Sequence, residues 1–172
     1  MEESLTQKEN ITDAISRTFG IGSHDARHQT ALSLAYIGDC IYDLVIRTVL
    51  TTHDGGKNGS LHHKATKYVN ASAQADLIDA IEDELTEEEN KVYHRGRNST
   101  NNASKAKHAS IIAYRKATGL EALIGYLYLE GRYGRLTELM KTGLDRIGFE
   151  DQSVDGCVEA VQITEKIWNQ EN

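Results

Sequence analysis

Asp39 is a carboxylate within an unusually apolar stretch of sequence, LAYIGDCIYDLVIR at residues 34–47. In a helix its neighbours three and four positions away are mostly apolar or aromatic, and a carboxylate buried there without a partner costs several kcal/mol. Asp43 has Arg47 four residues further on, whereas Asp39 has no basic residue at such a spacing. Gly38 costs a helix roughly 1 kcal/mol relative to alanine and indicates close backbone packing. Asp39 is therefore either a ligand of a metal ion or a buried acid paired with a distant lysine or arginine.

Glu121 is a second carboxylate in an apolar setting, because it opens the run EALIGYLYL at residues 121–129. Two carboxylates brought together would suit Mg²⁺, which prefers oxygen ligands and keeps several of its waters. The local pattern has another interpretation. Thr118-Gly-Leu-Glu121 fits a capping box, in which Glu121 would bond back to the start of a helix. By itself the pattern favours the cap.

The charges of the chain are segregated along the sequence. The net charge of −7 over 172 residues argues at first against a nucleic-acid partner. Residues 90–120 and 55–75, however, contain no Asp or Glu, while residues 76–89 carry eight acids and no base. Such segregation can build a positive field on one face of an acidic protein. The alternative is a set of ordinary solvated surfaces.

Composition excludes several classes of protein. The hydrophobic fraction is 39%, and no apolar run approaches the roughly 18–20 residues that span a bilayer. The acidic, polar N-terminus resembles neither a signal peptide nor a transit peptide. Cys40 and Cys157 lie far apart, and Cys40 is expected to be a small core residue. We therefore expect a reduced, cytoplasmic protein that has no membrane partner.

These residues must be positioned by helices. The chain has no proline, and it lacks runs of alternating β-branched residues. We predict an all-α fold in one domain over residues 1–150, with residues 151–172 as a C-terminal extension packed on it. The helix holding Asp39 is apolar almost all round, which predicts burial on most sides. The expected helices are Asn10 to Phe19, Asp25 or His28 to Leu50, Leu61 to Val69, Ala71 to Glu84, Thr86 (as the cap of a capping box) to Arg95, Lys105 or Lys107 to Leu129 with a possible break at Gly119, Arg135 to Ile147, and Ser153 to Trp168. The segments 53–60 and 95–104 are expected to be loops.

Four ordered segments together resemble the catalytic domain of the ribonuclease III family, and most closely its small bacterial branch, Mini-ribonuclease III, which has no double-stranded RNA-binding domain. The family carries a GDAVL-like helix and, later in the chain, an EALIGA-like helix. The segments that carry the resemblance are LAYIGDCIYDLVIR at 34–47, LHHKATKYVNASAQA at 61–75, TEEENKVYHRGRN at 86–98 and YRKATGLEALIGYLYL at 114–129. The resemblance extends from about Ala31 to Leu139, nearly two-thirds of the chain.

The resemblance implies a homodimeric endonuclease of double-stranded RNA, with the GD helix at or near the subunit interface. Asp39 and Glu121 would be the catalytic, metal-holding carboxylates for Mg²⁺, with Mn²⁺ as a possible substitute. The products would carry 5′-phosphate and 3′-hydroxyl ends, and the substrate would be precursor 23S ribosomal RNA, selected with a ribosomal protein as helper. Duplex RNA is read mainly through phosphates and 2′-hydroxyls. The residues expected to contact it are His62, Lys64, Lys67, Arg95, Arg97, Asn98, Lys105 and Lys107.

The chain departs from larger ribonuclease III enzymes at two positions. They have further acids where this chain has Ala35 and Thr118, as Mini-ribonuclease III does, so the expected site rests on two carboxylates. The basic loop also has Ala106-Lys107 in place of the usual Pro-Lys step.

Two other functions remain open from the sequence. The dipeptides His24-Asp25 and His53-Asp54 suggest an HD-type metal phosphohydrolase, although no further His and Asp set at metal-ligand spacing follows them. The other alternative is a non-catalytic module of the same fold that only binds structured RNA.

Overall fold

The computed structural model describes residues 10–22, 26–54, 58–99 and 111–149 of the chain. These residues form helices and no strand, so the predicted all-α class is confirmed for the described part of the chain. The helices are α1 (Ile11–Phe19), η1 (Ala26–His28), α2 (Ala31–Asp54), α3 (Asn58–Tyr68), α4 (Ala71–Ile81), η2 (Glu82–Glu84), α5 (Glu87–Arg97), α6 (Ile111–Leu129) and α7 (Tyr133–Arg146). The C-terminal extension expected at 151–172, with its helix from Ser153, lies outside the described residues.

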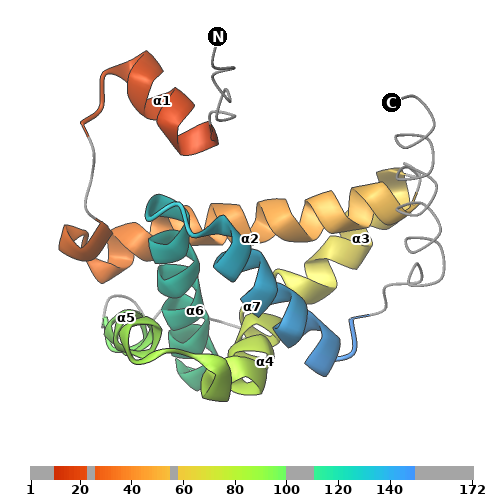
Figure 1. Ribbon diagram of the computed structural model, residues 1–172. Helices are drawn as coiled ribbons and strands as arrows, with labels where there is room; N and C mark the ends of the chain where they lie inside the picture. Colours follow the sequence, from red (N-terminus) through yellow and green to blue (C-terminus); the bar gives the residue numbers. More distant parts are fainter. Residues whose placement is uncertain (1–9, 23–25, 55–57, 100–110, 150–172) are drawn as a thin grey trace, which may run out of the picture.

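Helix α6 is the centre of the fold. Every residue from Ala117 to Leu127 except Glu121 is buried, and α2, α4, α5 and α7 all pack on this helix. Figure 1 shows α2 running across the width of the helical body, with α6 crossing it. A helix that is apolar on every side is stable only when other helices surround it. The sequence of α6 therefore fixes its central place.

Several helix ends follow from local capping residues. The side chain of Asn10 caps α1, and that of Asn70 caps α4. Gly20 ends α1 with φ at 63°, in the left-handed region that favours glycine. At α5 the predicted capping box is confirmed, because Thr86 and Glu89 each bond the other's backbone amide.

Other boundaries differ from the prediction. Helix α2 begins at Ala31, after the separate turn η1, rather than at Asp25 or His28. It continues to Asp54, and α3 starts at Asn58, so most of the predicted loop at 53–60 is helical. Residues 53–54 and 58–60 belong to these helices although small polar residues of this kind are typical of loops.

Gly119 does not break α6. A Cβ atom at this position would lie 2.6 Å from the ring of Tyr93 on α5. The glycine therefore serves the close packing of α5 on α6, and the predicted break is wrong.

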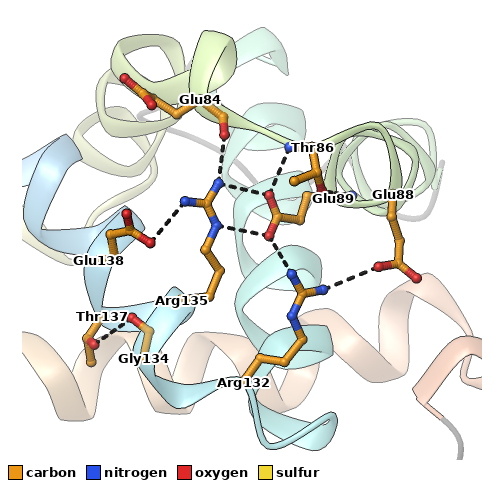
Figure 2. Close-up of polar contacts among 9 residues, drawn as sticks. All are labelled: Glu84, Thr86, Glu88, Glu89, Arg132, Gly134, Arg135, Thr137 and Glu138. Carbon is orange, nitrogen blue, oxygen red and sulfur yellow. Dashed lines mark hydrogen bonds and ion pairs between the residues drawn. The ribbon is translucent and has the colours of Figure 1, made fainter.

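A buried acid joins α5 to α7. Glu89 is 0% exposed and lies between Arg132 and Arg135, as Figure 2 shows. Arg135 donates to its two carboxylate oxygens from Nε and Nη2, both at 3.1 Å, and Arg132 donates at 3.0 Å. Burial alone would raise the pKa of Glu89, but the hydrogen bonds from Arg135 and from the Thr86 amide outweigh it and lower that pKa.

One side of α2 is not covered by the described residues of the single chain. Leu32, Tyr36, Cys40 and Leu44 are exposed and recur every four residues, so they form one stripe along the helix. Tyr36 is 81% exposed. The predicted burial of α2 on most sides and of Cys40 in the core is therefore wrong for the single chain. An apolar sequence does not reveal whether its partner is the same chain or another molecule.

Candidate active site

Two glycines bring the backbones of α2 and α6 into contact. A Cβ atom at Gly38 would lie 1.8 Å from the carbonyl oxygen of Glu121, and one at Gly125 would lie 2.1 Å from that of Leu34. No side chain fits in either place. The close packing expected at Gly38 is confirmed, and it sets Asp39, the next residue, beside the turn of α6 that carries Glu121.

We expect Gly38→Ala to destabilise the protein by about 3 kcal/mol or more, at the upper end of the usual effect of overpacking, because backbone atoms cannot move aside as a flexible side chain can. Thermal or urea denaturation measures the change. Gly134→Ala is the matched control, since that helical glycine has nothing within 4 Å of an added Cβ. The control variant should be as stable as the parent or up to about 1 kcal/mol more stable. Equal effects of the two substitutions would contradict this account of the helix contact.

The carboxylates of Asp39 and Glu121 act on each other electrostatically. Burial, and after it the charge of Asp39, raise the pKa of Glu121 from its ordinary value of 4.5 to about 7. The pKa of Asp39 is raised by partial burial and then by Asp43. Within the described chain, no lysine or arginine is among the groups that shift either pKa. The two acids are thus close together and uncompensated, which is unfavourable unless a cation joins them.

Glu121 is not a helix cap. Thr118 lies inside α6 and donates its hydroxyl to the Tyr114 carbonyl at 3.1 Å, one turn back. The capping-box interpretation of this segment is therefore wrong. Helix α6 already begins at Ile111, so Glu121 lies in its middle, where the helix itself satisfies the backbone amides.

Asp43 has the structural role that its spacing predicts. It forms an ion pair with Arg47 one turn further along α2, at 2.6 Å. The described residues contain no group of three or more His, Cys, Asp or Glu side chains that could hold a metal ion. Ala35 and Thr118, at the positions where larger family members have acids, are both buried. The candidate site in this part of the chain is a pair of carboxylates.

Gln74 is a residue of the site that the sequence did not reveal. It lies on α4 and is 2% exposed, and its amide lowers the pKa of Glu121 against the two raising effects. A glutamine between alanines in a helical segment carries no signal of a site. Only the packing of α4 on α6 brings it to Glu121.

The candidate RNA-binding residues lie on two separate helices. His62 and Lys67 are exposed on α3, with Lys64 half-buried. Arg95 is exposed and Arg97 half-buried on α5, and Asn98 is the exposed residue that follows that helix. Lys105 and Lys107 lie outside the described residues.

Figure 1 places α3 and α5 near opposite ends of α2. The described basic residues therefore form two sets on separate helices, and the positive field on one face stays a prediction. Segregation along the sequence fixes which helices are basic, but their separation is fixed by the fold.

The structure adds no support to an HD-type site. Asp54 is the last residue of α2, so the His53-Asp54 pair ends a helix, and His24-Asp25 lies outside the described residues. None of the helices in the described ranges is long and apolar enough to cross a membrane.

Comparison with known proteins identifies the family. The family model described as "Ribonuclease III domain" matches residues 32–132. Among the curated relatives, Mini-ribonuclease 3 of Enterococcus faecalis is 43% identical over 126 residues, which cover 72% of this chain and 95% of that protein. Mini-ribonuclease 3 of Clostridium tetani is 47% identical over 118 residues, covering 68% of this chain and 78% of the relative.

A solved structure has the same fold. The crystal structure of a protein from Fusobacterium nucleatum superposes with a TM-score of 0.64 at 28% identity, over 72% of this chain and 98% of that protein. Ribonuclease III enzymes act on double-stranded RNA and in general depend on a divalent metal ion. The matched region contains α2, with Asp39, and α6, with Glu121. The chain therefore belongs to the ribonuclease III family, among the Mini-ribonuclease 3 enzymes, and is an endoribonuclease that cleaves double-stranded RNA.

Proposed function

We propose that Asp39 and Glu121 hold the catalytic Mg²⁺ ion of this endoribonuclease, with Mn²⁺ as a possible substitute. The observation that carries the proposal is the meeting of the two carboxylates where α2 and α6 touch, with no basic residue of the described chain compensating either one. A fold does not retain two such acids side by side for stability. A hard cation with oxygen ligands is the partner that their chemistry fits.

When bound, a divalent ion supplies activation of the attacking water and neutralisation of charge at the phosphate. The chain's own part is to fix the positions of the two carboxylates. Asp39 is fixed by α2 next to Gly38, while Glu121 is held in the buried centre of α6. Because the pKa of Glu121 is about 7 in the protein alone, binding of a divalent ion by this carboxylate would release a proton near neutral pH. Metal affinity should therefore rise with pH through about 7.

The test is incubation of the purified protein with a long RNA duplex and Mg²⁺, with EDTA as control. We expect metal-dependent shortening that leaves 5′-phosphate and 3′-hydroxyl ends, and a loss of roughly a thousandfold or more in Asp39→Asn. His53→Ala should cleave normally. Loss of cleavage with His53→Ala, but not with Asp39→Asn, would favour the HD-type alternative. An absence of metal-dependent shortening would favour the RNA-binding module.

We infer that the enzyme works as a homodimer through the apolar stripe of α2, formed by Leu32, Tyr36, Cys40 and Leu44. A symmetric pair of subunits presents one site to each strand of a duplex, so both strands can be cut with a stagger. The stripe adjoins Asp39 along the same helix, which supports an arrangement with both sites near the interface. From the family resemblance we further propose precursor 23S ribosomal RNA as the natural substrate, a ribosomal protein as helper and the cytoplasm as the location.

Tyr36→Lys should convert the protein to a monomer of 19.1 kDa and remove most duplex cleavage. Loss of a central aromatic residue from an interface costs about 2–4 kcal/mol, which weakens dimerisation by roughly 30- to 1000-fold. Light scattering after size-exclusion chromatography measures the mass. Phe19→Lys is the control, because Phe19 is 74% exposed on α1, outside the stripe. A monomeric parent protein, or a dimer that survives Tyr36→Lys and not Phe19→Lys, would contradict the proposed interface.

A further inference from the structure

Gln74 has a buried donor without an acceptor. Its side chain is 2% exposed, and its amide nitrogen makes no hydrogen bond that meets ordinary geometric limits with any described residue. A buried donor left in this state costs about 1–3 kcal/mol. A leucine or methionine of similar volume would avoid that cost, so packing alone does not explain a glutamine here.

The unpartnered amide lies at the candidate metal site. Gln74 is on α4, which packs on α6, and its side-chain amide interacts with the Glu121 carboxylate and lowers the pKa of that group. In the protein alone, the contact between the Gln74 amide nitrogen and the Glu121 carboxylate does not meet the geometric limits of a hydrogen bond. Three helices therefore meet at Glu121: α6 carries it, α2 contributes Asp39 and α4 contributes Gln74.

We propose that Gln74 is a positioning residue, whose amide N–H holds one oxygen of the Glu121 carboxylate so that the other oxygen faces the divalent cation. The inference rests on the proposed role of Asp39 and Glu121. A carboxylate that binds a metal through one oxygen commonly accepts a hydrogen bond on the other, and this bond fixes its orientation. The donor of Gln74 is buried and already beside the acceptor, so completing the bond requires little movement.

The test is Gln74→Met, which keeps the length of the side chain and removes the amide, with Gln74→Leu as a second variant. Loss of such a hydrogen-bonding partner typically weakens metal affinity by about 10- to 100-fold. Mg²⁺ affinity is measured without RNA, from the rise in melting temperature with metal concentration, and Mn²⁺ affinity by electron paramagnetic resonance. We expect both affinities to fall by this factor. The melting temperature of the metal-free protein should stay the same or rise, because an unpartnered buried donor is removed.

Cleavage kinetics provide a second readout. The Mg²⁺ concentration for half-maximal activity should rise by the same 10- to 100-fold, while KM for duplex RNA at saturating Mg²⁺ stays within about twofold of the parent. A residue with a purely structural role would lower the melting temperature and leave metal affinity unchanged. That result in both variants would overturn the inference.

Asn90→Leu is the matched control. Asn90 also has a buried side-chain atom without a partner, its Oδ1, but it lies on α5 and has no part in the electrostatics of Glu121. Its substitution should leave metal affinity unchanged, and an equal loss there would overturn the inference. Glu121→Gln, measured in parallel, distinguishes a wrong metal site from a wrong role for Gln74. If Glu121→Gln retains full metal affinity, the proposed metal site is wrong. If it abolishes binding while Gln74→Met retains it, only the role of Gln74 is wrong.

Discussion

Glu121→Gln should abolish Mg²⁺-dependent cleavage of duplex RNA and, at the same time, make the metal-free protein more stable at pH 8. The loss of cleavage should be roughly a thousandfold or more, since several kcal/mol of transition-state stabilisation depend on the bound metal. The gain in stability has a different origin. It follows from removing a charge that the folded protein holds at a cost.

The sign of the stability effect follows from the pKa of Glu121. Folding raises this pKa from 4.5 to about 7, chiefly through burial and then through Asp39. Between these two values the folded protein binds more protons than the unfolded chain, so stability falls as pH rises through this window. Above about pH 7 the full penalty is roughly 3 kcal/mol, the equivalent of about 2.5 pKa units. A neutral glutamine removes this penalty, so Glu121→Gln should be more stable by about 2 to 3 kcal/mol at pH 8 and nearly unchanged at pH 4.5.

Urea denaturation at pH 4.5, 6 and 8 in EDTA measures this effect. Added Mg²⁺ should stabilise the parent protein at pH 8 and leave Glu121→Gln unaffected. Glu87→Gln is the control, because Glu87 is exposed and its ion pair among the described residues is with Lys91. Its effect should remain within about 0.5 kcal/mol at each pH. A variant at position 121 that is less stable than the parent at pH 8 would show that this carboxylate stabilises the fold, and would remove the main support for a metal ligand.

Glu89→Ala should cause the largest loss of stability among the acids of α5, about 3 kcal/mol or slightly more. The substitution leaves Arg132 and Arg135 without their buried partner, and breaking such a pair typically costs about 3–5 kcal/mol. Both arginines keep some contact with solvent, which places the effect at the lower end of that range. Because typical domains are stable by only about 5–15 kcal/mol, this is a substantial fraction of the total.

Neighbouring Glu88 provides the control for this network. It is exposed and pairs with Arg132 at 3.3 Å, so Glu88→Ala should cost less than about 1 kcal/mol. The network also has a pH dependence of opposite sign to that of Glu121. The pKa of Glu89 is lowered in the folded protein, so its contribution is present above its ordinary value of 4.5 and is lost as pH falls below it. Equal costs for the two substitutions at pH 7 would contradict the view that Glu89 joins α5 to α7.

The helical class and most helix ends could be predicted from the sequence because they depend on residues within four positions of each other. Asn10, Asn70 and Thr86 cap their helices through side chains that bond amides two or three residues away. Asp39 and Glu121 could also be chosen from the sequence as candidate site residues. Each is an acid in an apolar stretch, and the motifs around both resemble those of one family.

Only the tertiary structure decided the features that depend on contacts between different helices. The local sequence pattern predicts that Glu121 caps a helix. In the structure α6 begins ten residues earlier, so Glu121 lies in the middle of this helix and close to Asp39. Gln74 and the arginine pair on Glu89 join segments more than 40 residues apart, and no spacing in the sequence predicts such contacts. Cys40 and Tyr36 lie in an apolar segment that predicts burial, yet they are on the exposed side of α2. The sequence alone therefore determined that Asp39 and Glu121 are acids in apolar helices. The contact of α2 with α6 at Gly38 determined that they form one site, because only there do the two backbones approach without side chains between them.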